Sequence, residues 1–159
     1  MFTLSIAQWK VSVKRHPVVF VQGGDNVSKI NQEGASVESE ITAYIDRKAR
    51  YPSVFMIQNT SHIESYPIYL QYVPGSWSYK GESDMSIIEY LEAFLRYQEK
   101  DFLQFKVVNG KIEVADGSKN PITLDPGDTA KLWINIKLTT GSAEGDAFDF
   151  SLELVAPPA

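Results

Sequence analysis

Hydrophobic and polar residues alternate along much of the chain, most regularly over residues 130–138 and 148–155. Successive side chains of a β-strand point to opposite faces, so a period of two predicts strands with one buried face and one solvent-exposed face. The polar, glycine-bearing connection at residues 139–146 favours an antiparallel pair. A turn containing Pro126 and Gly127 precedes the pair. We take these two strands as the spine of a two-layer β domain.

The same alternation predicts about nine or ten strands in the whole chain. Asn109-Gly110 lies between two apolar runs and is typical of a type I′ hairpin turn. Because no strand–helix–strand rhythm is present, the sequence predicts an all-β fold, an antiparallel two-sheet sandwich of jelly-roll type. Further strands are expected at residues 18–22, 36–45, 54–58, 65–73, 102–108, 111–114 and 122–124, of which 36–45 is a second long strand.

One stretch carries apolar residues at helical spacing, and it predicts one inserted helix over about residues 84–99 that covers the sheet. The start of this helix is indicated by Ser86 with Glu89 three residues on, which has the form of a capping box, or by Asp84 as the alternative N-cap. The apolar stripe consists of Ile87, Ile88, Leu91, Phe94 and Leu95.

The alternation changes phase near the start of the sequence. Phe2, Leu4 and Ile6 occupy even positions, whereas the apolar residues from Trp9 onward occupy odd positions. A slip of one residue moves every later side chain to the other face, so a single straight strand cannot bury both sets. Two interpretations stay open, a β-bulge near residues 7–8 or a free N-terminal strand that leaves the domain.

Composition narrows the functional classes. The length of 159 residues suits one domain, and 43% hydrophobic with 12% aromatic residues is typical of a folded globular chain. The net charge of −5 and the lack of a basic run argue against a nucleic-acid partner. The absence of cysteine excludes disulfides, zinc–thiolate sites and cysteine nucleophiles. No apolar run is long enough to cross a bilayer, so we expect no membrane insertion. Either the protein stays inside the cell, or this is a mature chain whose leader has been removed.

Candidate catalytic chemistry is sparse. His16 and His62 stand alone, without the spacing of a metal site, and we expect both at the surface. The sequence contains no nucleophile elbow, phosphate-binding glycine loop or nucleotide fingerprint. Several aspartates fall in predicted turns, but none follows the calcium-loop pattern. We therefore expect a protein that is not an enzyme and that has no cofactor or metal centre.

Three large aromatic residues are predicted at solvent-exposed positions: Trp77 and Tyr79 on a glycine-flanked loop, and Trp133 on the polar face of its strand. Exposed aromatic residues usually mark a contact surface, for a sugar or for another protein, unless the helix or a long loop covers them. Asn26 and Asn59 begin Asn-x-Ser sequons in predicted loops or strand ends, which suits N-glycosylation of an exported protein.

Residues 53–61 followed by 67–71 resemble the strand, Asn-turn, strand core of the TasA/camelysin-type matrix fibre proteins and archaeal bundling pili. Residues 122–130, then 132–140 and 148–156, resemble the closing strands of that family. The resemblance implies an exported jelly-roll subunit that polymerises, with the N-terminal strand of one subunit completing the sheet of the next. It thus favours the free-strand interpretation of the phase change.

We therefore expect a structural subunit of an extracellular, cell-surface filament or pilus that supports adhesion or biofilm. Subunits would self-associate head-to-tail into a homopolymer by donor-strand complementation. Residues 1–8 are the candidate donor strand, with Phe2, Leu4 and Ile6 as the inserted side chains, and residues 9–159 form the β-sandwich domain. A carbohydrate-binding β-sandwich module that uses the three predicted exposed aromatics is the main alternative. A viral or phage jelly-roll structural protein is another.

Overall fold

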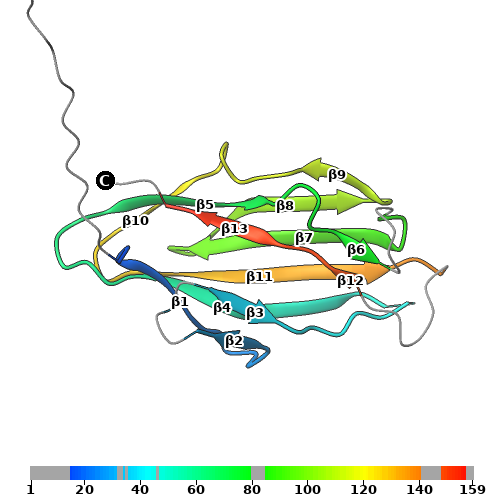
Figure 1. Cartoon of the computed structure of the whole chain (residues 1–159), viewed down its shortest axis with the longest axis horizontal. Coiled ribbons are helices and arrows are strands. Elements are labelled where there is room, and N and C mark those ends of the chain that lie inside the picture. Colours follow the sequence, from blue (N-terminus) through cyan, green and yellow to red (C-terminus); the bar gives the residue numbers. More distant parts are fainter. Residues whose placement is uncertain are drawn as a thin grey trace, which may run out of the picture.

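The computed structural model describes residues 15–31, 34, 36–45, 47–79, 85–140 and 148–156. Over these ranges the chain forms thirteen strands, paired antiparallel throughout, and no helix (Figure 1). The described part of the chain accordingly contains no helix that could cross a membrane. The predicted all-β class with antiparallel sheets is confirmed.

The larger layer is a six-stranded sheet with the order β1-β4-β11-β7-β8-β9. Its longer strands follow the long axis of the molecule, and β11 lies between β4 and β7 (Figure 1). The bounds are Val18–Gln22 for β1, Ala49–Asn59 for β4, Thr129–Leu138 for β11, Ile88–Tyr97 for β7, Lys100–Val108 for β8 and Lys111–Val114 for β9.

The smaller layer is a three-stranded sheet with the order β10-β5-β13. Two short pairs, β12-β6 and β2-β3, complete the described strands. The bounds are Ile122–Leu124 for β10, Tyr66–Tyr72 for β5, Leu152–Val155 for β13, Phe148–Asp149 for β12, Ser78–Tyr79 for β6, Ser28–Ile30 for β2 and Val37–Ser39 for β3.

The alternating apolar side chains meet between the two layers. The prediction for β11 is confirmed, because all four of its even-numbered apolar residues from Leu132 to Leu138 are buried. Tyr72 of the smaller sheet stacks on Phe105 of the larger sheet with ring centroids 5.4 Å apart. Phe105 in turn stacks on Phe150 at 5.6 Å. Aromatic contacts of this kind add to the area that the core removes from water.

A buried amide also joins the two layers, on the side of β8 and β5. Gln104 is fully buried, and its Oε1 accepts a hydrogen bond from the backbone N–H of Leu70 at 2.8 Å. Its Nε2 donates to the backbone carbonyls of Phe102 and Asn120, at 3.1 and 3.2 Å. A side chain at Gly117 would overlap this amide, so the close approach requires glycine there.

The inserted helix predicted over about residues 84–99 is wrong, because residues 88–97 form strand β7. Its backbone pairs with β8 on one side and β11 on the other, which satisfies the groups that a helix would bond internally. Phe94 lies on the outer face, so the helical stripe combined residues from both faces of a strand. Gln98 and Glu99, both with positive φ, then turn the chain tightly into β8. The inward residues alternate as Leu91, Ala93, Leu95 and Tyr97.

The hairpin predicted at Asn109-Gly110 is confirmed. Both residues have positive φ, 48° and 79°, and they join Val108 to Lys111 of the next strand. The amide of Asn109 also donates to the carbonyl of Glu89 at 2.7 Å, which attaches the turn to the start of β7.

We predict that Gln104→Leu lowers the free energy of unfolding by about 1–3 kcal/mol, because it leaves the buried N–H of Leu70 without an acceptor. Urea unfolding followed by tryptophan fluorescence measures the change. Gln71→Leu is the matched control, since among the described residues the amide of Gln71 hydrogen-bonds only to the exposed Glu153 carboxylate, at 3.1 Å. We expect the control to stay within about 0.5 kcal/mol of the parent protein. Equal losses in the two variants would show that Gln104 does not join the layers.

Candidate functional site

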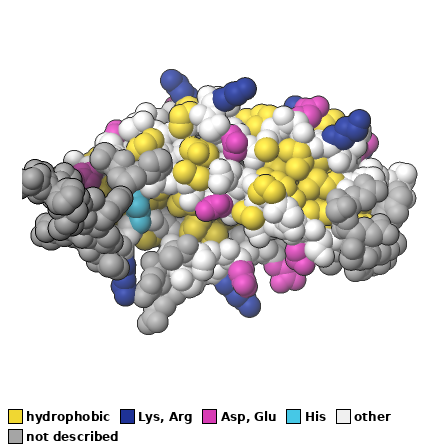
Figure 2. All heavy atoms as spheres, turned by 45° about the horizontal axis from the view of Figure 1, so that its top comes forward, with side chains coloured by type: hydrophobic (Ala, Val, Ile, Leu, Met, Phe, Trp, Pro, Cys, Tyr) yellow, Lys and Arg dark blue, Asp and Glu magenta, His cyan; other side chains and the backbone are white. Residues whose placement is uncertain are grey.

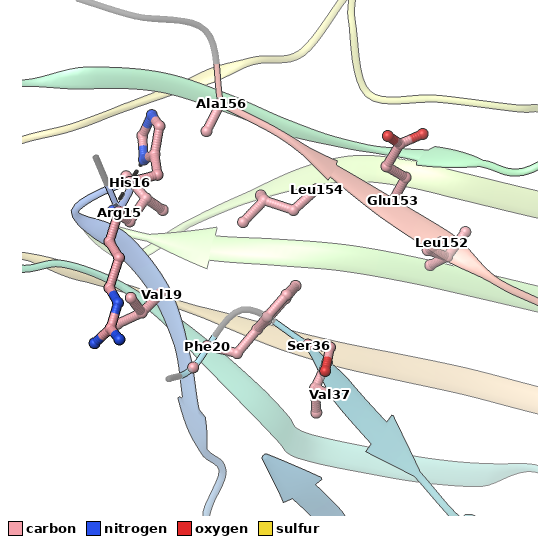
Figure 3. Close-up of a pocket in the computed structure, with 12 residues that line it drawn as sticks. Arg15, His16, Val19, Phe20, Ser36, Val37, Leu152, Glu153, Leu154 and Ala156 are labelled. Carbon is pink, nitrogen blue, oxygen red and sulfur yellow. Dashed lines mark hydrogen bonds between the residues drawn. The ribbon is translucent and has the colours of Figure 1, made fainter. Parts of the chain in front are cut away.

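A groove separates β1, the edge of the larger sheet, from β13, the edge of the smaller sheet (Figure 3). Its volume is about 590 Å³, within the range of sites that hold ligands. Phe20 and Leu154 point toward one another across it (Figure 3). The floor and walls are mainly apolar and include Val18, Phe20, Val37, Leu152, Leu154 and Ala156.

Hydrophobic side chains also reach the surface outside this groove. On the face seen in Figure 2 they form one broad area and several smaller groups, interrupted by single charged side chains. Extended apolar areas on a soluble protein usually mark contact surfaces.

The edge of β13 offers backbone groups to the groove. Among the described residues β13 pairs with β5 alone. The amides of Leu70 and Tyr72 in β5 donate away from β13, each at 2.8 Å. Hydrogen-bonded and non-hydrogen-bonded pairs alternate along an antiparallel ladder. The residues opposite them, Leu154 and Leu152, therefore direct their N–H and C=O groups toward the open edge.

On the edge of β1, by contrast, backbone N–H groups are already hydrogen-bonded. The N–H of Val18 donates to Nδ1 of His16 at 3.1 Å, and the N–H of Phe20 donates to the carbonyl of Gly34 at 2.8 Å. Gly34 has a φ of 71°, and a side chain there would press on Val19, so glycine is required at this contact. Of the two strands that border the groove, β13 is the one able to accept another strand.

The far edge of the larger sheet is also protected, but by charge. β9 has four residues and pairs with β8 alone in the described part of the chain. Lys111 and Glu113 are exposed on it, and Glu113 lies 3.8 Å from Lys106. Short edge strands that carry charged side chains resist pairing with other strands.

One end of the groove is polar. His16 packs edge-on against Tyr66, with ring centroids 4.8 Å apart, and the Tyr66 hydroxyl donates to the Glu64 carboxylate at 2.6 Å. This hydrogen bond raises the pKa of Tyr66, and burial and the negative charge of Glu64 act in the same direction. The hydroxyl therefore stays protonated at neutral pH. Arg15 lines the same end, so the groove has a polar mouth and an apolar interior.

The predicted donor residues Phe2, Leu4 and Ile6 lie outside the described residues, as does the predicted boundary between the donor strand and the domain. Both stay predictions. The groove itself was not predicted, because its two walls come from opposite ends of the chain. The available signal was the inward series Leu152, Leu154 and Ala156, on a strand at the edge of its sheet.

The prediction that Trp77 is exposed is wrong. Its side chain is 7% exposed and packs against Phe148 with ring centroids 4.8 Å apart and against Phe150 at 6.4 Å. The loop folds inward here because Tyr79 of β6 pairs with Phe148 of β12, which brings these rings together. Tyr79 is half-buried against the core.

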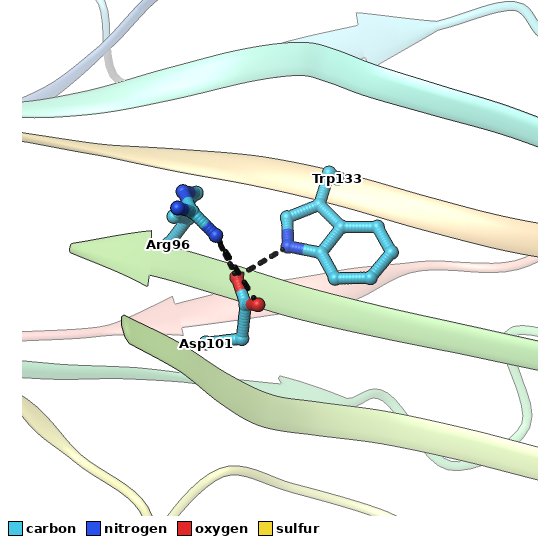
Figure 4. A network of polar contacts seen from close by, with 3 residues as sticks. All are labelled: Arg96, Asp101 and Trp133. Carbon is cyan, nitrogen blue, oxygen red and sulfur yellow. Dashed lines mark hydrogen bonds and ion pairs between the residues drawn. The ribbon is translucent and has the colours of Figure 1, made fainter. Parts of the chain in front are cut away.

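Trp133 is half-buried on the outer face of the larger sheet. Phe94, from the strand on one side, stacks on the indole at 4.5 Å, and Arg50, from the strand on the other side, lies 4.6 Å from the ring centre. The indole N–H donates to Asp101 at 2.8 Å, and Arg96 contacts the same carboxylate at 3.3 Å (Figure 4). Because Phe94 and Arg50 cover opposite faces of the indole, neither face is open for a sugar ring.

The two sequons differ. Asn59 is fully buried, and its Nδ2 donates to the carbonyls of Glu64 and Leu124 at 2.7 and 2.9 Å. The prediction that Asn59 is a glycosylation site in the folded protein is therefore wrong. Asn26 is exposed in a turn with a φ of 54°, and its Oδ1 accepts a hydrogen bond from Gln22 at 3.1 Å. Glycosylation at Asn26 stays a prediction.

Among the described residues, no group of three or more His, Asp or Glu side chains is placed to hold a metal ion. No model of a known protein family matches the chain. Comparison with curated proteins finds no significant match. The groove and its edge strand therefore provide the basis for a functional proposal.

We predict that Trp77→Ala lowers the free energy of unfolding by about 3–5 kcal/mol, as expected for a buried aromatic side chain. Trp133→Ala should cost less, about 1–2 kcal/mol, because it removes a half-buried stack and a cation–π contact. Urea unfolding of each variant measures the difference. A Trp77→Ala protein as stable as its parent would contradict the buried position of this side chain.

Proposed function

We propose that this chain is a structural subunit of an extracellular filament or pilus, a two-sheet sandwich of jelly-roll type that polymerises by donor-strand complementation. The observation that carries the proposal is the apolar groove beside β13, whose edge has no partner among the described residues. Residues 2–6 of one subunit would enter the groove of the next and add a fourth strand to the smaller sheet. No covalent chemistry is required, which agrees with the sparse catalytic residues.

The donor sequence matches the length and period of the groove. Residues 2–6 span about 17 Å when extended. β13 together with Ala156 contains the same number of residues. Phe2, Leu4 and Ile6 would point inward at the same period of two as the leucines of β13, while the residues between them face solvent. In strand addition the main chain supplies hydrogen bonds and alternate side chains supply specificity.

The size of the hydrophobic contribution decides whether such a contact lasts. Burying three large apolar side chains at ~1.5–3 kcal/mol each contributes about 5–9 kcal/mol. Association and strand ordering oppose this with about 4–15 kcal/mol. Side-chain insertion and the ladder hydrogen bonds along β13 are therefore both needed, which favours an edge that offers an apolar groove as well as unpaired backbone groups.

The carbohydrate-binding alternative has less support. Trp77 is buried and both faces of Trp133 are covered, so of the three candidate aromatics only the half-buried Tyr79 remains. Sugar stacking requires an accessible ring face. A cell-surface location and a role in adhesion or biofilm rest on the resemblance to matrix fibre and pilus subunits.

Deleting residues 1–7 should yield soluble monomers with an open groove, because the donor is lost while the acceptor stays intact. Sedimentation velocity and electron microscopy measure assembly, and fluorescence anisotropy measures binding of a labelled peptide of residues 2–8. The matched control is the same peptide with Leu4→Asp, which places a charge in the apolar groove and should bind at least tenfold more weakly. Unchanged filaments from the truncated protein would exclude the proposal.

Separate donor and acceptor variants provide a second prediction. Leu154→Asp should block acceptance while leaving the donor segment intact, and the protein lacking residues 1–7 should only accept. Each should remain monomeric alone, and a mixture should form one-to-one dimers that mass photometry detects. Thermal unfolding of Leu154→Asp checks that the domain is folded. Long polymers from the mixture would be inconsistent with one donor and one groove per subunit.

A further inference from the structure

We propose that the donated strand runs antiparallel to β13 of the neighbouring subunit, with its Leu4 beside Leu154. This inference rests on the proposed function and adds the direction and register of the inserted strand. The direction matters because it decides whether donation produces an open filament or a closed dimer.

Side-chain sizes along the groove favour this direction. The inward residues of β13 and its extension are Leu152, Leu154 and Ala156, so the smallest side chain of the series stands at the Ala156 end. The donor begins with its largest side chain, Phe2, which fits beside Ala156 when the strand is antiparallel. A parallel strand would place Phe2 beside Leu152 and Ile6 beside the alanine, with crowding at one end and a gap at the other. Close packing disfavours both defects.

The backbone favours the same register. Leu152 and Leu154 direct their N–H and C=O groups toward the open edge, as derived above from the hydrogen bonds of β5. An antiparallel strand with Leu4 opposite Leu154 exchanges both hydrogen bonds with that residue, and it repeats this exchange two residues along at Leu152. β5 already pairs antiparallel with the other edge of β13, so the completed sheet would be uniformly antiparallel.

The end of the groove at which Arg15 and His16 lie determines whether strand donation gives an open filament or a closed dimer. Arg15 and His16 lie at the Ala156 end of the groove, and Leu152 marks the opposite end (Figure 3). The ring contact between His16 and Tyr66 supports this placement, because Tyr66 lies beyond the β5 residues that pair with β13. Arg15, the first residue that the structure describes, therefore lies at the Ala156 end of the groove.

Antiparallel insertion leaves Ile6 at the Leu152 end of the acceptor. Residues 7–14, which span at most about 29 Å, would join this Ile6 to the donor's Arg15, and an extended connection would place the donor subunit at the Leu152 end of the acceptor. The Arg15 end of one subunit then faces the Leu152 end of the next, a head-to-tail contact that propagates. Parallel insertion would leave Ile6 at the Ala156 end of the acceptor, where the acceptor's own Arg15 lies. Two subunits would then exchange strands and close as a two-fold dimer.

Paired cysteines test the direction, because the chain has no native cysteine. In the proposed register Ser5 lies opposite Glu153 on the solvent side, within the Cα separation that a disulfide allows. The double variant Ser5→Cys with Glu153→Cys should give a ladder of covalent oligomers after mild oxidation. The matched control is Ser5→Cys with Val155→Cys, which would face each other only if the strand were parallel. It should give at least tenfold less cross-linking.

The possible outcomes separate the inference from the proposed function. A ladder from the Glu153 pair and little product from the Val155 pair support the antiparallel direction. Covalent dimers from the Val155 pair overturn it, whereas loss of assembly on deleting residues 1–7 would still uphold strand donation. A disulfide within one chain, or intact filaments in which neither pair links, also overturns the inference. Continued assembly after the deletion removes the proposed function itself.

Discussion

A sheet of six strands presents a wider apolar face than a sheet of three strands covers, and this inequality determines where the molecule is closed and where it is open. Beneath the smaller sheet the cover is complete: Leu95, Phe105 and Ile136 are almost fully buried. Toward β1 the cover ends at β13, where Leu152 and Leu154 are only partly buried. The groove lies where a fourth strand of the smaller sheet would be.

The opposite side of the two layers is closed by a polar contact. A buried amide is costly unless its groups are paired, and both polar atoms of Gln104 find backbone partners. It supplies the amide of Leu70 with an acceptor in the other sheet, a role that a neighbouring strand would otherwise fill. The β13 side has no such contact in the described part of the chain. On one side, a side chain thus supplies the partner that a strand's backbone group needs. On the other side, in the proposed assembly, another subunit supplies such partners.

Local signals explain which elements were predictable. The Asn109-Gly110 turn and the burial of alternate residues in β11 depend on neighbouring residues, and both predictions are confirmed. β7 was misassigned because its outer face also carries an apolar residue, Phe94, which stacks on Trp133 of the adjacent strand. An apolar residue on both faces of a strand produces the spacing of a helical stripe, and only the cross-strand partner distinguishes the two.

Long-range packing explains the predictions that are wrong at the candidate sites. Trp77 and Asn59 were assigned to the surface because polar residues and turn signals surround them. Trp77 joins an aromatic cluster that includes residues from the far end of the chain. Asn59 replaces a missing backbone partner for Leu124. The groove depends on residues from both ends of the sequence meeting across the two layers, so no local pattern predicts it.

A sheet edge that accepts one strand must also prevent further addition. After insertion the outer edge of the donated strand would face β1 across the former groove. The alternate amides of β1 are already bound there, Val18 to the imidazole of His16 and Phe20 to the carbonyl of Gly34. β9, at the far edge of the larger sheet, is short and charged. In the proposed assembly one groove would therefore accept one strand, and this limit would separate ordered polymerisation from the indefinite edge pairing of aggregation.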